Sequence, residues 1–311
     1  MNSDGPRVSL VIPAYNEQSS IRRCLLAAIG QSRAAHEILV VDNRSTDRTA
    51  EIANETAVEF PDAGVRVIPQ HEAQGLIPTR NRGFDVATGD VLGRIDADTI
   101  IEPGWVETLS ETFRDSTIAA ATGPVGYYDM PLRSLGVRAD DRVRRTLLKF
   151  TKEYRFVFGS NMAVRADAWR AIRDRVALDE SDLLHEDIDI SINLALAGMS
   201  VAYCPDLVAG ISGRRLEDGP RAFYDYAKRF DRTYDHYGLP DLALRAPIWI
   251  LLATYLPLKL VRAMWQRQHR RWAPTDDAAH PIDPANVPSE IAGVSHWRRR
   301  SHALQVREAE T

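Results

Sequence analysis

Two aspartates lie one residue apart in Asp96-Ala-Asp98, directly after the mainly apolar run Val91-Leu-Gly-Arg-Ile95. Side chains two positions apart in a strand share a face, so both carboxylates can approach one divalent cation. Mg²⁺ and Mn²⁺ take oxygen ligands and often share them with the phosphates of a substrate. The pattern alone is weak, because it recurs in Asp187-Ile-Asp189 and because aspartates also serve in turns and helix caps. The pair is therefore a candidate metal site that needs support from its context.

Two kinds of segment alternate around these aspartates. Short apolar runs predict buried strands at 8–13, 37–42, 65–68 and 91–96. Amphipathic stretches predict helices at 21–29, 47–56, 79–87 and from Pro103 onward. This alternation predicts an α/β fold with a mainly parallel sheet covered by helices on both faces. Ligands bind beyond the carboxyl ends of such strands, where Asp42 and Asp96 stand.

The second half of the chain is less regular. Residues 125–155 are rich in arginine and show no clear period, so we expect a loop or insertion over the site. Further helices are predicted at 163–173, 188–197 and 219–237, and short strands at 201–203 and 207–209.

The composition restricts the class of protein. The 311 residues include 39 Lys and Arg and 43 Asp and Glu, for a net charge of −4, with 44% hydrophobic residues. These are globular values, and a mildly acidic chain is not a general nucleic-acid binder. The two cysteines, Cys24 and Cys204, cannot make a disulfide framework or a four-ligand zinc site. Residues 1–6 lack the pattern of a signal peptide, so we expect a cytoplasmic protein.

Residues 242–272 differ from the rest, since they contain six Lys or Arg and no acidic residue. Their apolar centre, 247–261, is shorter than the roughly 20 residues that cross a bilayer. Tryptophans with flanking arginines suit the membrane interface, so we expect a C-terminal helical extension that binds the inner face of the cell membrane. The alternative is a core helix pair broken at Pro257. The predicted domains are 1–238, catalytic, 239–272, membrane-interface, and 273–311, a loosely ordered tail.

The aspartate pair belongs to an ordered series of segments: Val8-Ser-Leu-Val-Ile-Pro-Ala-Tyr-Asn-Glu17, Val40-Val-Asp-Asn-Arg-Ser-Thr-Asp47, Thr79-Arg-Asn-Arg-Gly83, Ala87-Thr-Gly-Asp90, Asp96-Ala-Asp98, Gly159-Ser-Asn161 and His185-Glu-Asp187. Together they resemble the family 2 inverting glycosyltransferases, which have the GT-A fold. The resemblance covers roughly residues 7 to 215, and the ordered set is far more specific than any one member.

The resemblance implies how a nucleotide-sugar donor is held. The end of the first strand lines the nucleotide pocket, with Pro13, Ala14, Tyr15 and Glu17. Asp42 would accept a hydrogen bond from the base ring, and Arg80, or after it Arg82, would lie near ribose or phosphate.

The same resemblance implies the reacting groups. Asp98 would hold Mn²⁺ or Mg²⁺ on the diphosphate, with Asp96 as a second ligand nearer the ribose. Asp187, with Glu186 behind it, would be the general base, although Asp187 can also cap a helix. Asn161 would either hold the sugar or acceptor or serve only in a turn.

The chemistry is consistent with these residue types. A sugar leaves a nucleoside diphosphate when a metal neutralises the departing charge. The acceptor hydroxyl must lose its proton as it attacks, so a carboxylate is needed on the opposite face of the sugar. One displacement then inverts the anomeric carbon.

One part of the family pattern is missing. A histidine that often completes the metal site is replaced here by Ser212, and His236 is only a weak substitute. Arg214 and Arg215 follow, and they could face the diphosphate, an anionic acceptor or solvent. The third metal ligand therefore stays open.

We expect an inverting transferase that moves a sugar from a UDP- or GDP-sugar to a lipid-linked or glycan acceptor at the membrane surface, without nucleic acid. One alternative is a sugar-nucleotide nucleotidyltransferase, but such enzymes usually carry a glycine-rich basic loop where this chain has Tyr15-Asn16-Glu17. A second is an inactive, membrane-docked nucleotide-sugar-binding relative. The intact Asp96, Asp98 and Asp187 argue against that alternative, while the missing histidine leaves it open.

Overall fold

The computed structural model describes residues 5–150, 155–179, 183–239 and 245–269. Contacts within the chain separate a unit of residues 1–263 from a second unit of residues 264–311. The described part of the second unit is the end of the last helix. The predicted tail, 273–311, lies outside the described residues, and the predicted domain boundaries stay predictions.

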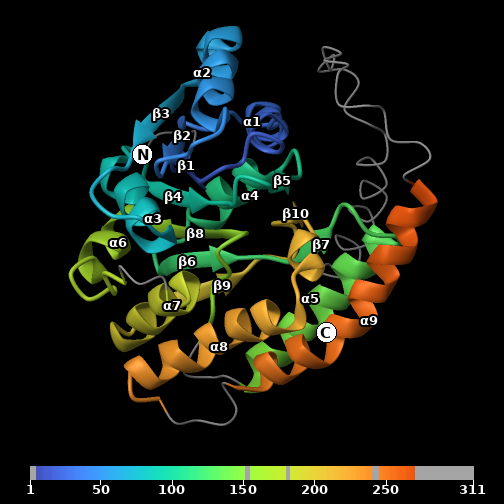
Figure 1. Cartoon of the computed structure of the whole chain (residues 1–311). Coiled ribbons are helices and arrows are strands. Elements are labelled where there is room, and N and C mark those ends of the chain that lie inside the picture. The colour runs from blue at the N-terminus through green and yellow to red at the C-terminus, as the bar shows by residue number, and fades with distance from the viewer. Residues whose placement is uncertain (1–4, 151–154, 180–182, 240–244, 270–311) are drawn as a thin grey trace, which may run out of the picture. The chain divides into compact units, whose positions relative to one another are not determined.

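Strands and helices alternate through the first unit (Figure 1). The strands are β1 (Val8–Ala14), β2 (Glu37–Asp42), β3 (Val65–Pro69), β4 (Val91–Arg94), β5 (Ile100–Ile101), β6 (Ile118–Thr122), β7 (Val125–Tyr127), β8 (Met162–Arg165), β9 (Ser200–Tyr203) and β10 (Ala209–Ile211). The α-helices are α1 (Ile21–Ile29), α2 (Thr49–Glu59), α3 (Leu76–Val86), α4 (Trp105–Thr112), α5 (Arg133–Phe150), α6 (Ala166–Ile172), α7 (Glu186–Leu196), α8 (Pro220–His236) and α9 (Ala246–His269). Short 3₁₀ turns are η1 (Pro61–Ala63) and η2 (Arg214–Glu217).

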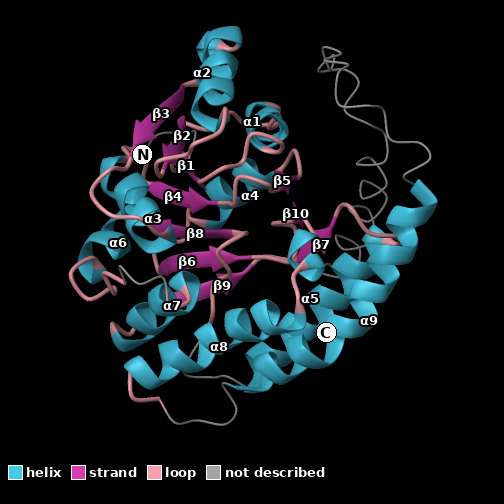
Figure 2. Cartoon of the chain, in the orientation of Figure 1, coloured by secondary structure: helices cyan, strands magenta, loops and turns pink. Residues whose placement is uncertain are grey.

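Seven strands form the main sheet in the order β3-β2-β1-β4-β8-β6-β9. All neighbouring pairs are parallel except those of β8, which runs antiparallel to β4 and β6. A smaller sheet has the order β5-β10-β7. Helices lie on both sides of the main sheet (Figure 2), so the predicted α/β architecture is confirmed.

Burial explains why these strands and helices form. Every residue of β1, β2 and β4 is buried, as expected for strands covered on both faces. Leu25 of α1 and Trp105 of α4 belong to the core on one face of the sheet. Phe84 of α3 and Trp169 of α6 belong to the core on the other face. The two cores fix the strand ends that carry Asp42 and the aspartate pair.

Two sequence predictions are wrong. Residues 163–173 do not form one helix, because Met162–Arg165 is a strand enclosed between β4 and β6. Residues 125–155 are not a loop, because they contain β7 and the 18-residue helix α5. Asp140–Arg144 and Asp141–Arg145 pairs, four residues apart, support α5.

The last helix, α9, continues through Pro257, so the alternative of a helix pair broken there is wrong. Within the first unit, Ile248, Tyr255 and Arg262 are buried on one side of α9. Trp249 and Leu256 are 69% and 59% exposed, so α9 also has an apolar side without cover among the described residues. The segment Ile248–Arg267 is long and apolar enough to cross a membrane, a test that core helices of soluble proteins also pass.

Candidate active site

The loops that follow β1 and β2 are joined by hydrogen bonds. Asn16 adopts a left-handed conformation with φ of 54°, which asparagine tolerates better than most residues. Its side-chain oxygen accepts the Thr46 N–H at 2.8 Å, and the Ser45 hydroxyl accepts the Asn16 N–H at 3.0 Å. The strand ends, Ala14 and Asp42, are register partners. This edge of the sheet is therefore held in one geometry.

The predicted nucleotide residues lie along this edge. Pro13 and Ala14 are buried in β1, while the Tyr15 side chain is half exposed. Asp42 is buried, and its Oδ1 atom has no hydrogen-bond partner among the described residues. Buried acceptors are nearly always satisfied in folded proteins, so this oxygen is suited to accept an N–H from a ligand.

Three carboxylates and two arginines meet beyond β1 and β4. Arg94 Nη2 lies 2.7 Å from Asp96 Oδ1. Arg214 Nε lies 3.0 Å from Asp98 Oδ2, and Arg214 Nη1 donates to Glu17 Oε2 at 2.7 Å. The five side chains carry a net charge of −1, so the cluster still attracts a cation.

The environment of Asp98 agrees with a metal-binding role. Burial, followed by the neighbouring carboxylates Asp96 and Glu17, raises the pKa of Asp98 to about 6 despite the opposing charge of Arg214. Arg214 alone does not offset the burial and the neighbouring carboxylates, and a divalent cation would add positive charge at this carboxylate. The oxygen donors Asp96 and Asp98 therefore fit Mn²⁺ or Mg²⁺.

The N-terminus of α7 carries the predicted base. Asp187 accepts hydrogen bonds from the Gly159 N–H at 2.9 Å and from the Ile188 N–H at 2.7 Å, and its Oδ1 lies 2.6 Å from His185 Nδ1. Burial opposes the charge of Asp187, but His185 and the Gly159 N–H outweigh it and lower its pKa to about 2. Asp187 is therefore ionised at neutral pH.

Glu186 is connected to the carboxylate cluster through Arg94. The buried Arg94 lies 3.3 Å from Glu186 Oε1 and also pairs with Asp96. Burial, and then the charge of Asp187, raises the pKa of Glu186. A methyl group on Gly159 would lie 2.1 Å from Arg94 Nη1 and 2.5 Å from Glu186 Oε1, so only glycine leaves room for this contact.

Arg80 and Asn161, two of the residues predicted to bind the donor, make hydrogen bonds to groups inside the protein. Arg80 is fully buried and donates to the Glu186 carbonyl at 2.6 Å and to Asn81, so it supports α7. Asn161 is also fully buried. Its amide accepts from Trp105 Nε1 at 2.7 Å and donates to the carbonyls of Pro124 and Leu207.

The two residues considered in place of the missing metal-site histidine contact other groups in this chain. Ser212 donates to Asp129 Oδ2 at 2.9 Å, and His236 stands at the exposed end of α8 against the Tyr237 ring. Arg214, two residues after Ser212, reaches Asp98 instead.

Arg94 was not predicted as a site residue, and the group that Arg214 contacts was left open. A usable signal existed for Arg94, because it is the one charged residue in an otherwise apolar four-residue strand. No comparable signal marks Arg214.

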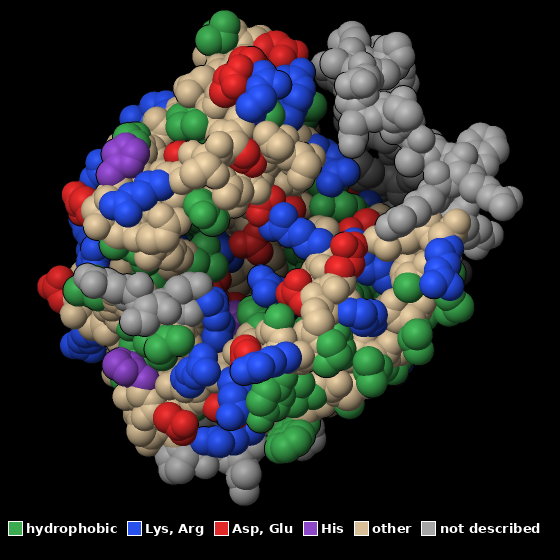
Figure 3. All heavy atoms as spheres, viewed as in Figure 1, with side chains coloured by type: hydrophobic (Ala, Val, Ile, Leu, Met, Phe, Trp, Pro, Cys, Tyr) green, Lys and Arg blue, Asp and Glu red, His purple; other side chains and the backbone are tan. Residues whose placement is uncertain are grey.

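Figure 3 shows acidic and basic side chains gathered in a hollow in the middle of the visible face.

Comparisons with known proteins agree with this geometry. The model of the family described as "Glycosyl transferase family 2" matches residues 9–179. Glycosyltransferase AglE of Haloferax volcanii is 33% identical over 129 residues, which are 41% of this chain and 42% of AglE. This chain thus spans less than half the length of that relative.

Two solved structures share the fold. Mannosyltransferase PcManGT of Pyrobaculum calidifontis, in complex with GDP-Man and Mn²⁺, aligns with a TM-score of 0.57 and 20% identity, over 88% of this chain and 77% of that one. TarS of S. aureus, in complex with UDP-GlcNAc, aligns with a TM-score of 0.53 and 17% identity, over 87% and 74%. The predicted GT-A fold is thereby confirmed. Since the family model covers more than half of it, the chain belongs to glycosyl transferase family 2.

Proposed function

We propose that the protein transfers a sugar from a nucleoside-diphosphate sugar to an acceptor hydroxyl or lipid phosphate, with inversion at the anomeric carbon. The observation that carries this proposal is the contact of Arg94 with both Asp96 and Glu186. Arg94 thereby links Asp96, which is expected to help hold the donor, to the carboxylate pair of α7, which is expected to act on the acceptor.

The donor lies along the ends of β1, β2 and β4. Tyr15 covers the base, and the unpartnered Oδ1 of Asp42 accepts a base N–H. Asp98 and Asp96 would hold Mn²⁺ or Mg²⁺, which would supply positive charge for the leaving diphosphate. PcManGT with GDP-Man and Mn²⁺, and TarS with UDP-GlcNAc, support a UDP- or GDP-sugar.

The carboxylates of α7 act on the acceptor. As the acceptor oxygen attacks the anomeric carbon, the bond to the diphosphate oxygen breaks and a carboxylate takes the acceptor proton. Asp187 is our first choice because it is ionised, with Glu186 as the second. Arg80 and His185 position the pair through the Glu186 carbonyl and the Asp187 carboxylate.

We assign the exposed apolar side of α9 to the inner surface of the cell membrane. The opposite side is held by polar contacts: Tyr255 donates to the Asp218 carbonyl at 2.6 Å, and Arg262 pairs with Glu217 at 2.8 Å. Those contacts favour a helix that lies on the membrane over one that crosses it. A membrane location supports a lipid-linked or cell-envelope glycan acceptor.

A donor panel tests the activity. We expect the full chain to release a nucleoside diphosphate from one UDP- or GDP-sugar with Mn²⁺ present, and Asp98→Ala to lose both this release and metal-dependent nucleotide binding. Asp115→Ala, on an exposed loop, is the matched control. In a parallel assay with a nucleoside triphosphate and a sugar 1-phosphate, release of pyrophosphate would indicate a nucleotidyltransferase. Nucleotide binding without turnover in either assay would indicate an inactive relative.

Liposome sedimentation tests the membrane surface. Trp249→Glu should reduce binding of the full chain to vesicles that contain anionic lipid. Val58→Glu, on the 81% exposed Val58 of α2, should not reduce it. Equal binding of both variants and the unchanged protein contradicts the assignment.

A further inference from the structure

The side chain of Arg214 occupies an oxygen of Asp98, the residue expected to hold the metal ion, and both oxygens of the neighbouring Glu17. Its Nε is 3.0 Å from Asp98 Oδ2, and its Nη1 donates to Glu17 Oε2 at 2.7 Å, while Nη2 contacts the other Glu17 oxygen. One guanidinium thus engages two of the three carboxylates in the cluster. An oxygen lone pair that accepts from an arginine cannot bind a cation at the same time.

The Arg214 side chain can leave while its backbone stays in place. Its side chain is 51% exposed, whereas those of Glu17 and Asp98 are each 11% exposed. The turn that carries it is fixed separately, because Asp129 accepts from the Gly213 N–H at 2.8 Å and from the Ser212 hydroxyl. A rotation of side-chain torsions alone would therefore free Asp98 Oδ2 and one oxygen of Glu17, while Glu17 Oε2 would keep the Ser20 hydroxyl as a donor at 2.6 Å.

The charges of the cluster favour such an exchange. With Arg214 in place the cluster has a net charge of −1. Without it, Glu17, Asp96, Asp98 and Arg94 carry a net charge of −2, which one divalent cation neutralises, and Arg94 is also paired with Glu186. The released guanidinium suits a diphosphate, because its planar donors match phosphate oxygens.

We propose that Arg214 is an exchangeable counter-ion that holds the metal site closed until a divalent cation displaces it, and that it then contacts the donor diphosphate. The inference deepens the proposed function and rests on its metal site at Asp98. This chain lacks the histidine that often completes the metal site. Arg214 would instead neutralise Asp98 until the metal binds.

Titration of the full chain with Mn²⁺ in the absence of nucleotide, with free Mn²⁺ followed by electron paramagnetic resonance, tests the exchange. Arg214→Gln should bind Mn²⁺ about five- to tenfold more tightly than the unchanged protein, the range expected when two partly exposed ion pairs no longer compete. Arg215→Gln is the control for general charge. Arg215 is 54% exposed, pairs with Asp218 at 3.8 Å and lies over the Tyr226 ring.

The second measurement is UDP or GDP binding at saturating Mn²⁺, which should weaken several-fold in Arg214→Gln and stay unchanged in Arg215→Gln. Unchanged Mn²⁺ affinity in Arg214→Gln, or an equal gain in both variants, overturns the exchange. Asp98→Ala separates this failure from failure of the metal site. If Asp98→Ala binds Mn²⁺ as the unchanged protein does, the site itself is wrong.

Discussion

Asp98→Asn should make the protein more stable and less active. In the fold, burial and the nearby carboxylates Asp96 and Glu17 raise the pKa of Asp98 from its ordinary value of 3.8 to about 6. At pH 7 the folded protein therefore holds a carboxylate in surroundings that disfavour its charge. Asparagine keeps an oxygen that can accept from Arg214 and removes that charge.

The expected gain follows from linkage. A difference of about two pKa units, at about 1.4 kcal/mol each, is worth about 3 kcal/mol at pH 7. Because the folded pKa is the higher one, the penalty on Asp98 shrinks as the pH falls through 6 and is gone below about 4. The stability advantage of Asp98→Asn should shrink over the same range.

Urea denaturation in the presence of a chelator, from pH 4 to pH 8, measures the difference in unfolding free energy between Asp98→Asn and the unchanged protein. Asp115→Asn is the control with the opposite sign, because hydrogen bonds from Thr117 lower the pKa of Asp115, so its replacement should bring no gain. A stability difference for Asp98→Asn that is absent at pH 7, or that is the same at every pH, refutes the reasoning. Added Mn²⁺ should stabilise the unchanged protein but not Asp98→Asn.

Three further predictions concern buried groups. Asn161→Ala should lower the free energy of unfolding by about 3–5 kcal/mol, since it leaves several buried polar groups without partners, and a loss of donor affinity without loss of stability would contradict this. Arg80→Met should destabilise by about 3 kcal/mol in thermal or urea unfolding, because the buried Asp189 loses its ion pair, and a neutral effect would show that Asp189 is not charged. Asp187→Asn should lower kcat by about 10²–10⁴-fold with donor affinity intact, and more than Glu186→Gln does; the reverse ranking would make Glu186 the base.

The sheet was predictable where the hydrophobic pattern matched the burial. β1, β2 and β4 are mainly apolar runs because both faces of the sheet are covered, and β2 and β4 end in polar residues at the site, Asp42 and Arg94. β8 was missed because its three buried residues and Arg165 lead straight into α6 and look like the start of a helix. α5 was missed because its charged pairs, rather than an apolar stripe, support it.

The site was predictable as a set of residues but not as a set of contacts. Motif spacing indicated Asp96, Asp98 and Glu186, carboxylates that Arg94 and Arg214 contact in the structure. It could not indicate that Arg80 points inward to α7, since a helix face alone does not show which neighbour it meets. The contact of Arg214 with Asp98 depends on how the small sheet brings η2 back to β4, which no local pattern records.

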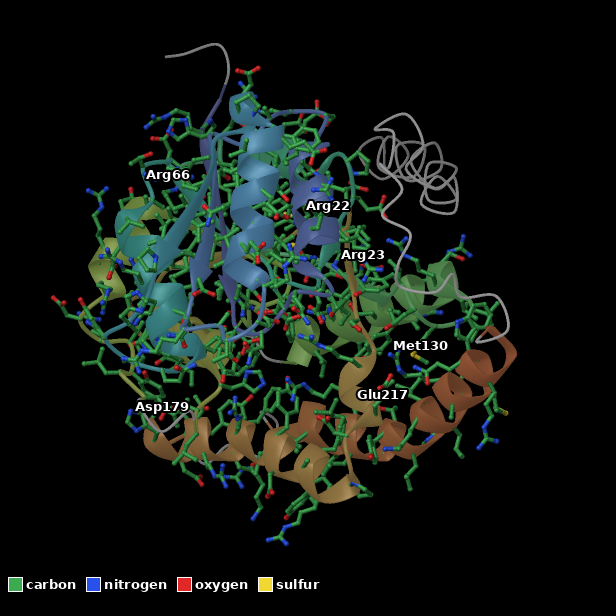
Figure 4. The ribbon with its side chains drawn as sticks, turned by 45° about the horizontal axis from the view of Figure 1, so that its top comes forward. Arg22, Arg23, Arg66, Met130, Asp179 and Glu217 are labelled. Carbon is green, nitrogen blue, oxygen red and sulfur yellow. The ribbon has the colours of Figure 1, made fainter. Side chains whose placement is uncertain are left out.

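The polar side of α9 also affects how the protein can be shortened. Glu217 belongs to η2, the turn that begins with Arg214, and it accepts from Arg262 of α9, while the Lys259 ammonium donates to its carbonyl at 3.1 Å. Figure 4 labels Glu217 on this turn and Met130, which packs in the same cluster as Tyr255 of α9. Removing α9 to improve solubility would therefore loosen the support of Arg214 at the same time. Replacing the exposed Trp249, Leu256 and Leu260 with polar residues would leave those contacts in place and is the better route to a soluble protein for crystallisation.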